Sequence, residues 1–212
     1  MPKFEPNKWN KDKYTRKSHN CYAYFLNKKS KKIRDRCRKR IQTKNLRNTT
    51  VKTMNKREKC RKCFRPKPGK AAGLHFTKKN YNCRDVVNRV LLDNKSIRKT
   101  SRYGKCPKKH YKGVVFLKNN YIPGVEWFHF ARQDSNKKWS HKSGRTFAEM
   151  YDINKRVYRN PNSKVCSHFC VPDDPSKLRM KEEREFIDCR VKKPIKSRKS
   201  RKSRKKYLKK RK

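Results

Sequence analysis

Apolar residues in the middle of the chain mark one helix and three strands. Between Asp85 and Asp93 they recur at positions 86, 87, 90 and 91, a spacing that predicts a helix. Lys112–Leu117 and Glu126–Arg132 are rich in β-branched and aromatic residues and predict two strands, and a third begins over Trp139–His141. Polar turns separate the strands, so we expect an antiparallel meander packed with helices, which is an α+β fold.

The flanking regions carry weaker patterns. Ser18 or Asn20 is placed to cap a helix whose first residues are Cys21-Tyr22-Ala-Tyr-Phe-Leu26. Residues 28–58 have too few apolar positions to specify a core face and read as either a basic helix or a mobile arm. A short helix is expected over residues 176–187.

Charge divides the chain into segments. The 212 residues contain 67 Lys and Arg but 16 Asp and Glu, a net charge of +51. Residues 190–212 hold 15 basic side chains and no acidic one, and residues 28–70 hold 20 basic and 2 acidic, so 12 of the acids lie in residues 71–189. We therefore expect a basic lead-in over 1–17, one α+β domain over 18–189 interrupted by a basic insert at 28–70, and a disordered tail over 190–212.

Such an excess of one sign opposes compaction and predicts a polyanionic partner. Nucleic acid is the first candidate and an anionic membrane surface is the second. No signature of a sequence-specific reader is present, which favours non-specific contact. The side chains expected to make it are Arg38, Lys39, Arg40, Arg198, Lys199, Arg201, Lys202, Arg204, Lys205 and Lys206.

The sequence also suggests where the protein works. It has neither an apolar run long enough to span a membrane nor the apolar segment of a secretory signal peptide. Together with the charge, this predicts a virion or another nucleic-acid-containing compartment, where other particle proteins are further potential partners.

One set of residues has the composition of a cysteine hydrolase site. Cys21 lies at a predicted helix start, where the helix dipole lowers the pKa of a thiol. His129 and His141 lie on two successive predicted strands, which can present both rings on one face. A base and a group that orients it would complete a nucleophilic site. The competing interpretation, a core thiol and a core histidine, stays open.

The segments 20–23 and 129–144 resemble the NlpC-type papain-like cysteine hydrolases, which carry a Cys at a helix start and then His or polar residues on two strands. The resemblance covers under a third of the chain. It implies a papain-like fold, with Cys21 as nucleophile, His129 as general base and His141 as the orienting group, and cleavage of amide bonds. Tyr22 and the 107 residues between Cys21 and His129 depart from the family pattern.

Nine cysteines leave at least one without an internal disulfide partner. Cys60, Cys63, Cys166 and Cys170 form two closely spaced pairs that suit a structural zinc site, the one cofactor the sequence suggests. Disulfides within an oxidised particle are the alternative.

Two functions follow from these patterns. The first is a basic structural protein that contacts nucleic acid and is built on a papain-like domain; its Lys-, Asn- and Cys-rich composition resembles that of virion proteins of large DNA viruses. The second is an active Cys-His-His amidase or peptidase that its basic segments tether to a polyanion.

Overall fold

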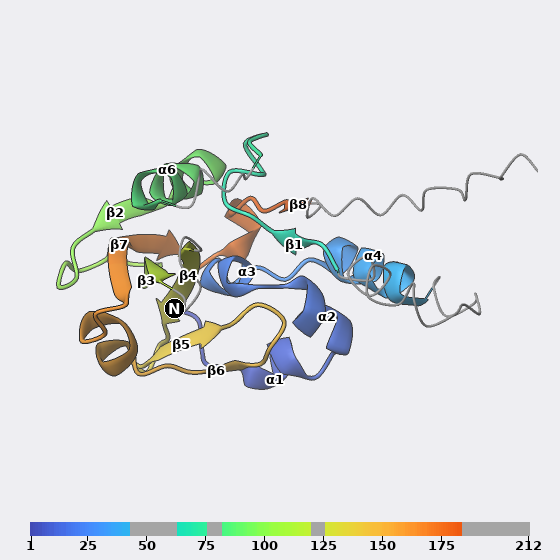
Figure 1. The fold of residues 1–212 in the computed structure, drawn as a ribbon, viewed down its shortest axis with the longest axis horizontal. Coiled ribbons are helices and arrows are strands. Elements are labelled where there is room, and N and C mark those ends of the chain that lie inside the picture. Colours follow the sequence, from blue (N-terminus) through green and yellow to red (C-terminus); the bar gives the residue numbers. More distant parts are fainter. Residues whose placement is uncertain (43–62, 76–81, 120–125, 184–212) are drawn as a thin grey trace, which may run out of the picture.

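The computed structural model describes residues 1–42, 63–75, 82–119 and 126–183 (Figure 1). Its helices, in chain order, are α1 (Pro6–Asn10), α2 (Lys13–Ser18), α3 (Cys21–Phe25), α4 (Lys31–Gln42), α6 (Cys83–Asp93), η3 (Asn154–Tyr158) and η4 (Pro175–Lys177). Its strands are β1 (Arg65–Pro66), β2 (Arg98–Thr100), β3 (His110–Asn119), β4 (Glu126–Gln133), β5 (Trp139–Lys142), β6 (Ala148–Met150), β7 (Ser163–Pro172) and β8 (Glu182–Glu183).

The main sheet has the strand order β2-β7-β3-β4-β5-β6, and each neighbouring pair is antiparallel. The predicted meander is confirmed as β3, β4 and β5, and the predicted helix at Asp85–Asp93 as α6. Strand β7 was not predicted. Strand β7 follows β6 in the sequence but lies between β2 and β3 in the sheet. This part of the sheet therefore depends on pairing between segments that are distant in the sequence.

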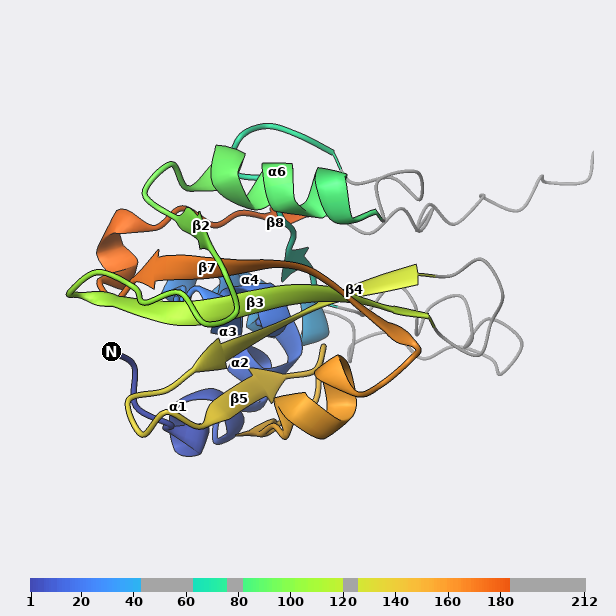
Figure 2. The ribbon, with the colours of Figure 1, turned by 90° about the vertical axis from the view of Figure 1, so that its left-hand side faces the viewer.

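Helices α3 and α6 cover one face of the sheet (Figure 2). Tyr22 and Phe25 of α3 and Val90 of α6 bury their side chains against Phe130 and Phe169 of the strands. Asn20 begins α3, because its side-chain oxygen accepts a hydrogen bond from the backbone N–H of Ala23 at 3.3 Å. Gly113 of β3 is required beneath this helix, since a Cβ there would lie 2.3 Å from the ring of Phe25.

The opposite face of the sheet has its own apolar cluster. Val114 and Phe116 of β3 and Ala131 of β4 pack there against Tyr151, Ile153 and Val157, from the segment that contains η3. The sheet is therefore covered on both faces, by α3 and α6 on one and by the η3 segment on the other.

The first 17 residues, expected to be a lead-in outside the domain, belong to the folded body. Trp9 of α1 is fully buried beside Tyr24, and the side chain of Asn10 exchanges two hydrogen bonds with the backbone of Ala148 in β6. Trp9 and these hydrogen bonds attach the segment to the body, although its composition is polar.

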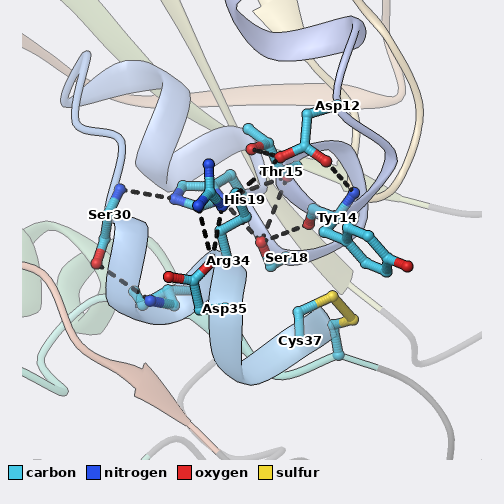
Figure 3. A network of polar contacts seen from close by, with 11 residues as sticks. Asp12, Tyr14, Thr15, Ser18, His19, Ser30, Arg34, Asp35 and Cys37 are labelled. Atoms are coloured by element: carbon cyan, nitrogen blue, oxygen red, sulfur yellow. Dashed lines mark hydrogen bonds and ion pairs between the residues drawn. A yellow bond between two sulfur atoms is a disulfide. The ribbon is translucent and has the colours of Figure 1, made fainter. Parts of the chain in front are cut away.

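Part of the predicted insert is also integral. Residues 31–42 form helix α4, which buries Ile33 and Cys37 and presents its basic side chains outward. A network fixes the start of this helix: His19 Nε2 accepts from the backbone N–H of Ser30 at 3.0 Å, and Arg34 lies 3.8 Å from the carboxylate of Asp12 (Figure 3).

The prediction of a helix over residues 176–187 is wrong for residues 176–183, the part that the structure describes. A single turn, η4, is followed by β8, whose Glu182 and Glu183 pair with Pro66 and Arg65 of β1. The predicted disordered tail over 190–212 lies outside the described residues.

Candidate functional site

His129 and His141 meet on one face of the sheet. They lie on adjacent antiparallel strands, as predicted, and His129 Nε2 is 2.7 Å from His141 Nδ1. The other ring nitrogen of His141, Nε2, lies 3.0 Å from Glu149 Oε1 on β6. With an ionised Glu149, His141 donates from Nε2 and accepts at Nδ1, so His129 donates from Nε2. The three side chains thus form a hydrogen-bonded row across three strands.

The environment of the pair favours the neutral form of both rings. Burial holds the pKa of His129 well below its usual range, and the neighbouring His141 and Lys118 lower it further. Burial also lowers the pKa of His141, although Glu149 acts in the opposite direction. The ring of Tyr151 lies 4.0 Å from that of His141, and burial raises the pKa of this phenol to about 12.

Cys21 lies on the other face of the sheet. It opens α3 as predicted, but it packs in the same apolar cluster as Phe128 and Phe130, the two strand neighbours of His129. The ring of His129 instead contacts Phe116 and Tyr151 of the opposite cluster. Because successive side chains of a strand point to opposite faces, the sheet separates the thiol from the imidazole. The expected Cys21–His129–His141 constellation is therefore not assembled.

The surroundings of Cys21 oppose an activated thiol. Its side chain is buried, and burial raises the pKa of the thiol, although the backbone of Phe130 and the charges of Arg65, Lys67 and Lys142 act in the opposite direction. The helix that starts at Cys21 has only five residues, so its dipole is small and does little to lower the pKa of the thiol.

A buried lysine lies on the same face as Cys21 and was not predicted. Lys142 has no exposed surface and donates from Nζ to the backbone oxygens of Arg16 at 2.8 Å and Gly144 at 2.9 Å. Burial lowers its pKa to about 7, with smaller contributions of the same sign from Arg65 and Arg16. Its position beside His141 in the sequence gave no signal of this, because strand alternation places the two side chains on opposite faces but does not decide which face the helices cover.

Three of the four cysteines proposed as zinc ligands are in separate disulfides. Cys63 is bonded to Cys37, Cys166 to Cys83 and Cys170 to Cys106, while Cys60 lies outside the described residues. The zinc prediction is corrected on this point, because a disulfide sulfur is not a thiolate ligand. Within the described ranges, no group of three or more His, Cys, Asp or Glu side chains is arranged to hold a metal ion.

The described basic residues of the predicted interface lie on α4. Arg38 and Lys39 are exposed there, and Arg40 is half-buried with its guanidinium 4.0 Å from the ring centre of Phe64. The helix contains seven basic residues and one acidic residue. The tail residues of the same prediction, Arg198, Lys199, Arg201, Lys202, Arg204, Lys205 and Lys206, lie outside the described residues.

Contacts around α4 bring together the ends of the two most basic segments. The disulfide Cys37–Cys63 joins α4 to the residue that follows segment 43–62. Arg36 of α4 lies 2.7 Å from Glu182 of β8, next to the start of segment 184–212. Figure 1 shows α4, β1 and β8 at one end of the molecule. We call helix α4, together with Cys63 and Glu182 beside it, the basic end.

Comparison with known proteins gives no relative: no family model, no curated protein and no solved structure matches this chain. Among the described helices, none is long and apolar enough to cross a membrane.

Proposed function

We propose that this protein contacts nucleic acid non-specifically, as a basic structural component of a nucleic-acid-containing particle. The observation that carries the proposal is the convergence at the basic end. Seven basic side chains of α4 lie beside the attachment points of two segments that hold 8 and 16 further basic residues, at 43–62 and 184–212. Because α4 and the attachment points of two further basic segments lie together, the positive field that attracts phosphates is concentrated there.

The three disulfides among the described residues support the particle setting. They bridge separations of 26, 83 and 64 residues, and bonds of this kind persist in oxidising surroundings. A virion whose interior becomes oxidised fits both the bonds and the charge.

We also propose that the body is a papain-like domain without a working nucleophile. A helix that begins at a cysteine and packs on an antiparallel sheet supports this assignment. The same geometry gives no support to an active hydrolase, since Cys21 and His129 lie on opposite faces. The proposal therefore rests on binding and not on catalysis.

The test is the salt dependence of binding to random-sequence DNA, measured by fluorescence anisotropy with the full chain. Affinity is expected to fall steeply between about 50 and 200 mM salt and to be insensitive to sequence. Replacing the seven predicted tail residues by Gln is expected to reduce the slope of log K against log salt by up to about 6, and Arg38→Gln with Lys39→Gln by up to about 2.

The matched control is Lys137→Gln with Lys138→Gln, which removes the same charge from the exposed turn between β4 and β5. An equal loss of affinity in this control would assign binding to net charge and not to the basic end. Affinity of the wild-type protein that does not change with salt would refute the proposal.

A further inference from the structure

A second basic surface lies at the β2 edge of the main sheet. Strand β2, the connection to β3 and the first residues of β3 carry seven Lys and Arg side chains between residues 98 and 112 and no acidic one. The disulfide Cys106–Cys170 ties this connection to β7. Figure 1 shows β2 and α4 on opposite sides of the molecule, so this surface is separate from the basic end.

An aromatic side chain projects from this connection. Tyr103 is 82% exposed, the largest exposure among the exposed large hydrophobic side chains of the described residues. The guanidinium carbon of Arg102 lies 5.2 Å from the centre of its ring and 3.6 Å from that of Tyr158 in η3. A ring left in solvent beside fixed positive charge is a surface on which a planar, electron-rich group can stack.

The charges around Tyr103 are held in place. Arg102 donates from Nη2 to Asn154 Oδ1 at 3.3 Å and accepts at its backbone oxygen from Lys112 Nζ at 2.7 Å. The register pairs Arg98 with Cys170 and Cys170 with Lys112, so Arg98 and Lys112 share the face of the sheet that carries η3. We call Arg98, Arg102, Tyr103, Lys112 and Tyr158 the basic–aromatic edge.

Acidic groups near this edge are few and one is already paired. The backbone N–H of Asp173 bonds to Lys109, and its carboxylate forms an ion pair with the amino group of Met1 at 3.1 Å. Asp152 precedes η3 and accepts a hydrogen bond from the backbone N–H of Lys155 at 3.0 Å. The charge of the edge therefore stays strongly positive.

We propose that the basic–aromatic edge binds single-stranded nucleic acid, with an unpaired base stacked on Tyr103 and phosphates held by Arg98, Arg102 and Lys112. Stacking selects the single strand, because bases in a duplex are stacked on one another and their faces are not accessible. This inference rests on the proposed function and adds to it the form of nucleic acid and a contact surface on the folded body.

The experiment compares the full chain with its Tyr103→Ala variant, using a labelled oligothymidylate of about 20 nucleotides and a duplex of the same length. The substitution removes the ring and leaves the net charge unchanged. Affinity for the single strand is expected to fall about 5-fold or more, with an unchanged salt slope, while duplex affinity stays constant. Tyr103→Phe, which keeps the ring, should bind as the wild type does.

The matched control is Phe147→Ala. Phe147 is also exposed, at 53%, with the guanidinium of Arg16 4.4 Å from its ring centre, but it lies on the segment before β6. This variant should bind the oligothymidylate as the wild type does. Because Tyr103 and Phe147 are both exposed, each variant should keep the wild-type unfolding transition.

The outcomes separate this inference from the proposed function. A wild-type protein that binds neither probe would refute both. Salt-dependent binding that is unaffected by Tyr103→Ala, or that weakens equally for the single strand and the duplex, would overturn the basic–aromatic edge and leave the proposed function standing.

Discussion

The Nε2 atom of His129 lies 2.7 Å from the Nδ1 atom of His141, and both rings face away from the helix that begins with Cys21. The two histidines therefore interact with each other and with Glu149, not with the thiol. The resemblance to cysteine hydrolases places these two histidines and Cys21 in one nucleophilic site, but the sheet lies between the histidines and the thiol.

We predict that Cys21 reacts slowly with iodoacetamide at neutral pH. The thiol is buried and its pKa is raised by that burial, so little thiolate is present and access is restricted. Mass spectrometry should find Cys21 labelled much faster after unfolding in guanidinium chloride. The His129→Ala variant should label at the native rate or faster. Rapid labelling of the native protein that disappears in His129→Ala would restore the hydrolase interpretation.

We predict that reduction, and not metal chelation, destabilises the protein. A disulfide that closes a long loop restricts the unfolded chain, so replacing Cys83 and Cys166 together by Ser is expected to lower the free energy of unfolding by about 2–5 kcal/mol. Thermal unfolding should show a lower midpoint after a reductant and no change after EDTA. A loss of stability with EDTA under oxidising conditions would instead support the zinc site.

Acid is predicted to destabilise the fold through His19. Burial lowers its pKa to about 4, and its Nε2 must be unprotonated to accept from Ser30. The unfolded chain, with a pKa of 6.5, binds the proton first as the pH falls, so the stability from this group is complete above about pH 6.5 and is lost toward pH 4. The full loss in the free energy of unfolding from this group is about 3 kcal/mol.

Urea unfolding measured across this pH range checks the prediction. His19→Gln keeps an acceptor for Ser30 but has no proton to bind, so the slope of stability against pH should fall by about 1.4 kcal/mol per unit. His110→Gln, at the first residue of β3, is the comparison. The same reduction in both variants would contradict the assignment to His19.

Asp134 is predicted to be essential for stability because it neutralises a buried guanidinium. Arg132 has no exposed surface, and its Nε lies 3.0 Å from Asp134 Oδ1, while its remaining nitrogens donate to Tyr24, Asn27 and Lys3. Asp134→Ala leaves this charge unpaired and should cost about 3–5 kcal/mol in unfolding free energy. Glu5→Ala, which breaks the exposed pair with Lys8, should cost less than about 1 kcal/mol. Similar losses in both variants would contradict this account.

Local signals predicted several elements well. The cap at Asn20, the helical spacing of α6 and the turn residues between β3, β4 and β5 act over a few residues, so the sequence carries them directly. The basic residues of the basic–aromatic edge surround one tyrosine in the sequence. The contact between Arg102 and Tyr158 that completes this surface depends on the tertiary structure.

The sequence by itself determined the α+β composition, the segregation of charge and the pairing of His129 with His141 on one face, because these depend on composition and on short-range periodicity. Tertiary structure alone decided that β7 lies between β2 and β3, that Cys63, Cys166 and Cys170 have three different disulfide partners, and that Cys21 lies across the sheet from His129. The physical reason is that a strand has two faces of equal local character, and only the packing of distant segments determines which face a helix covers.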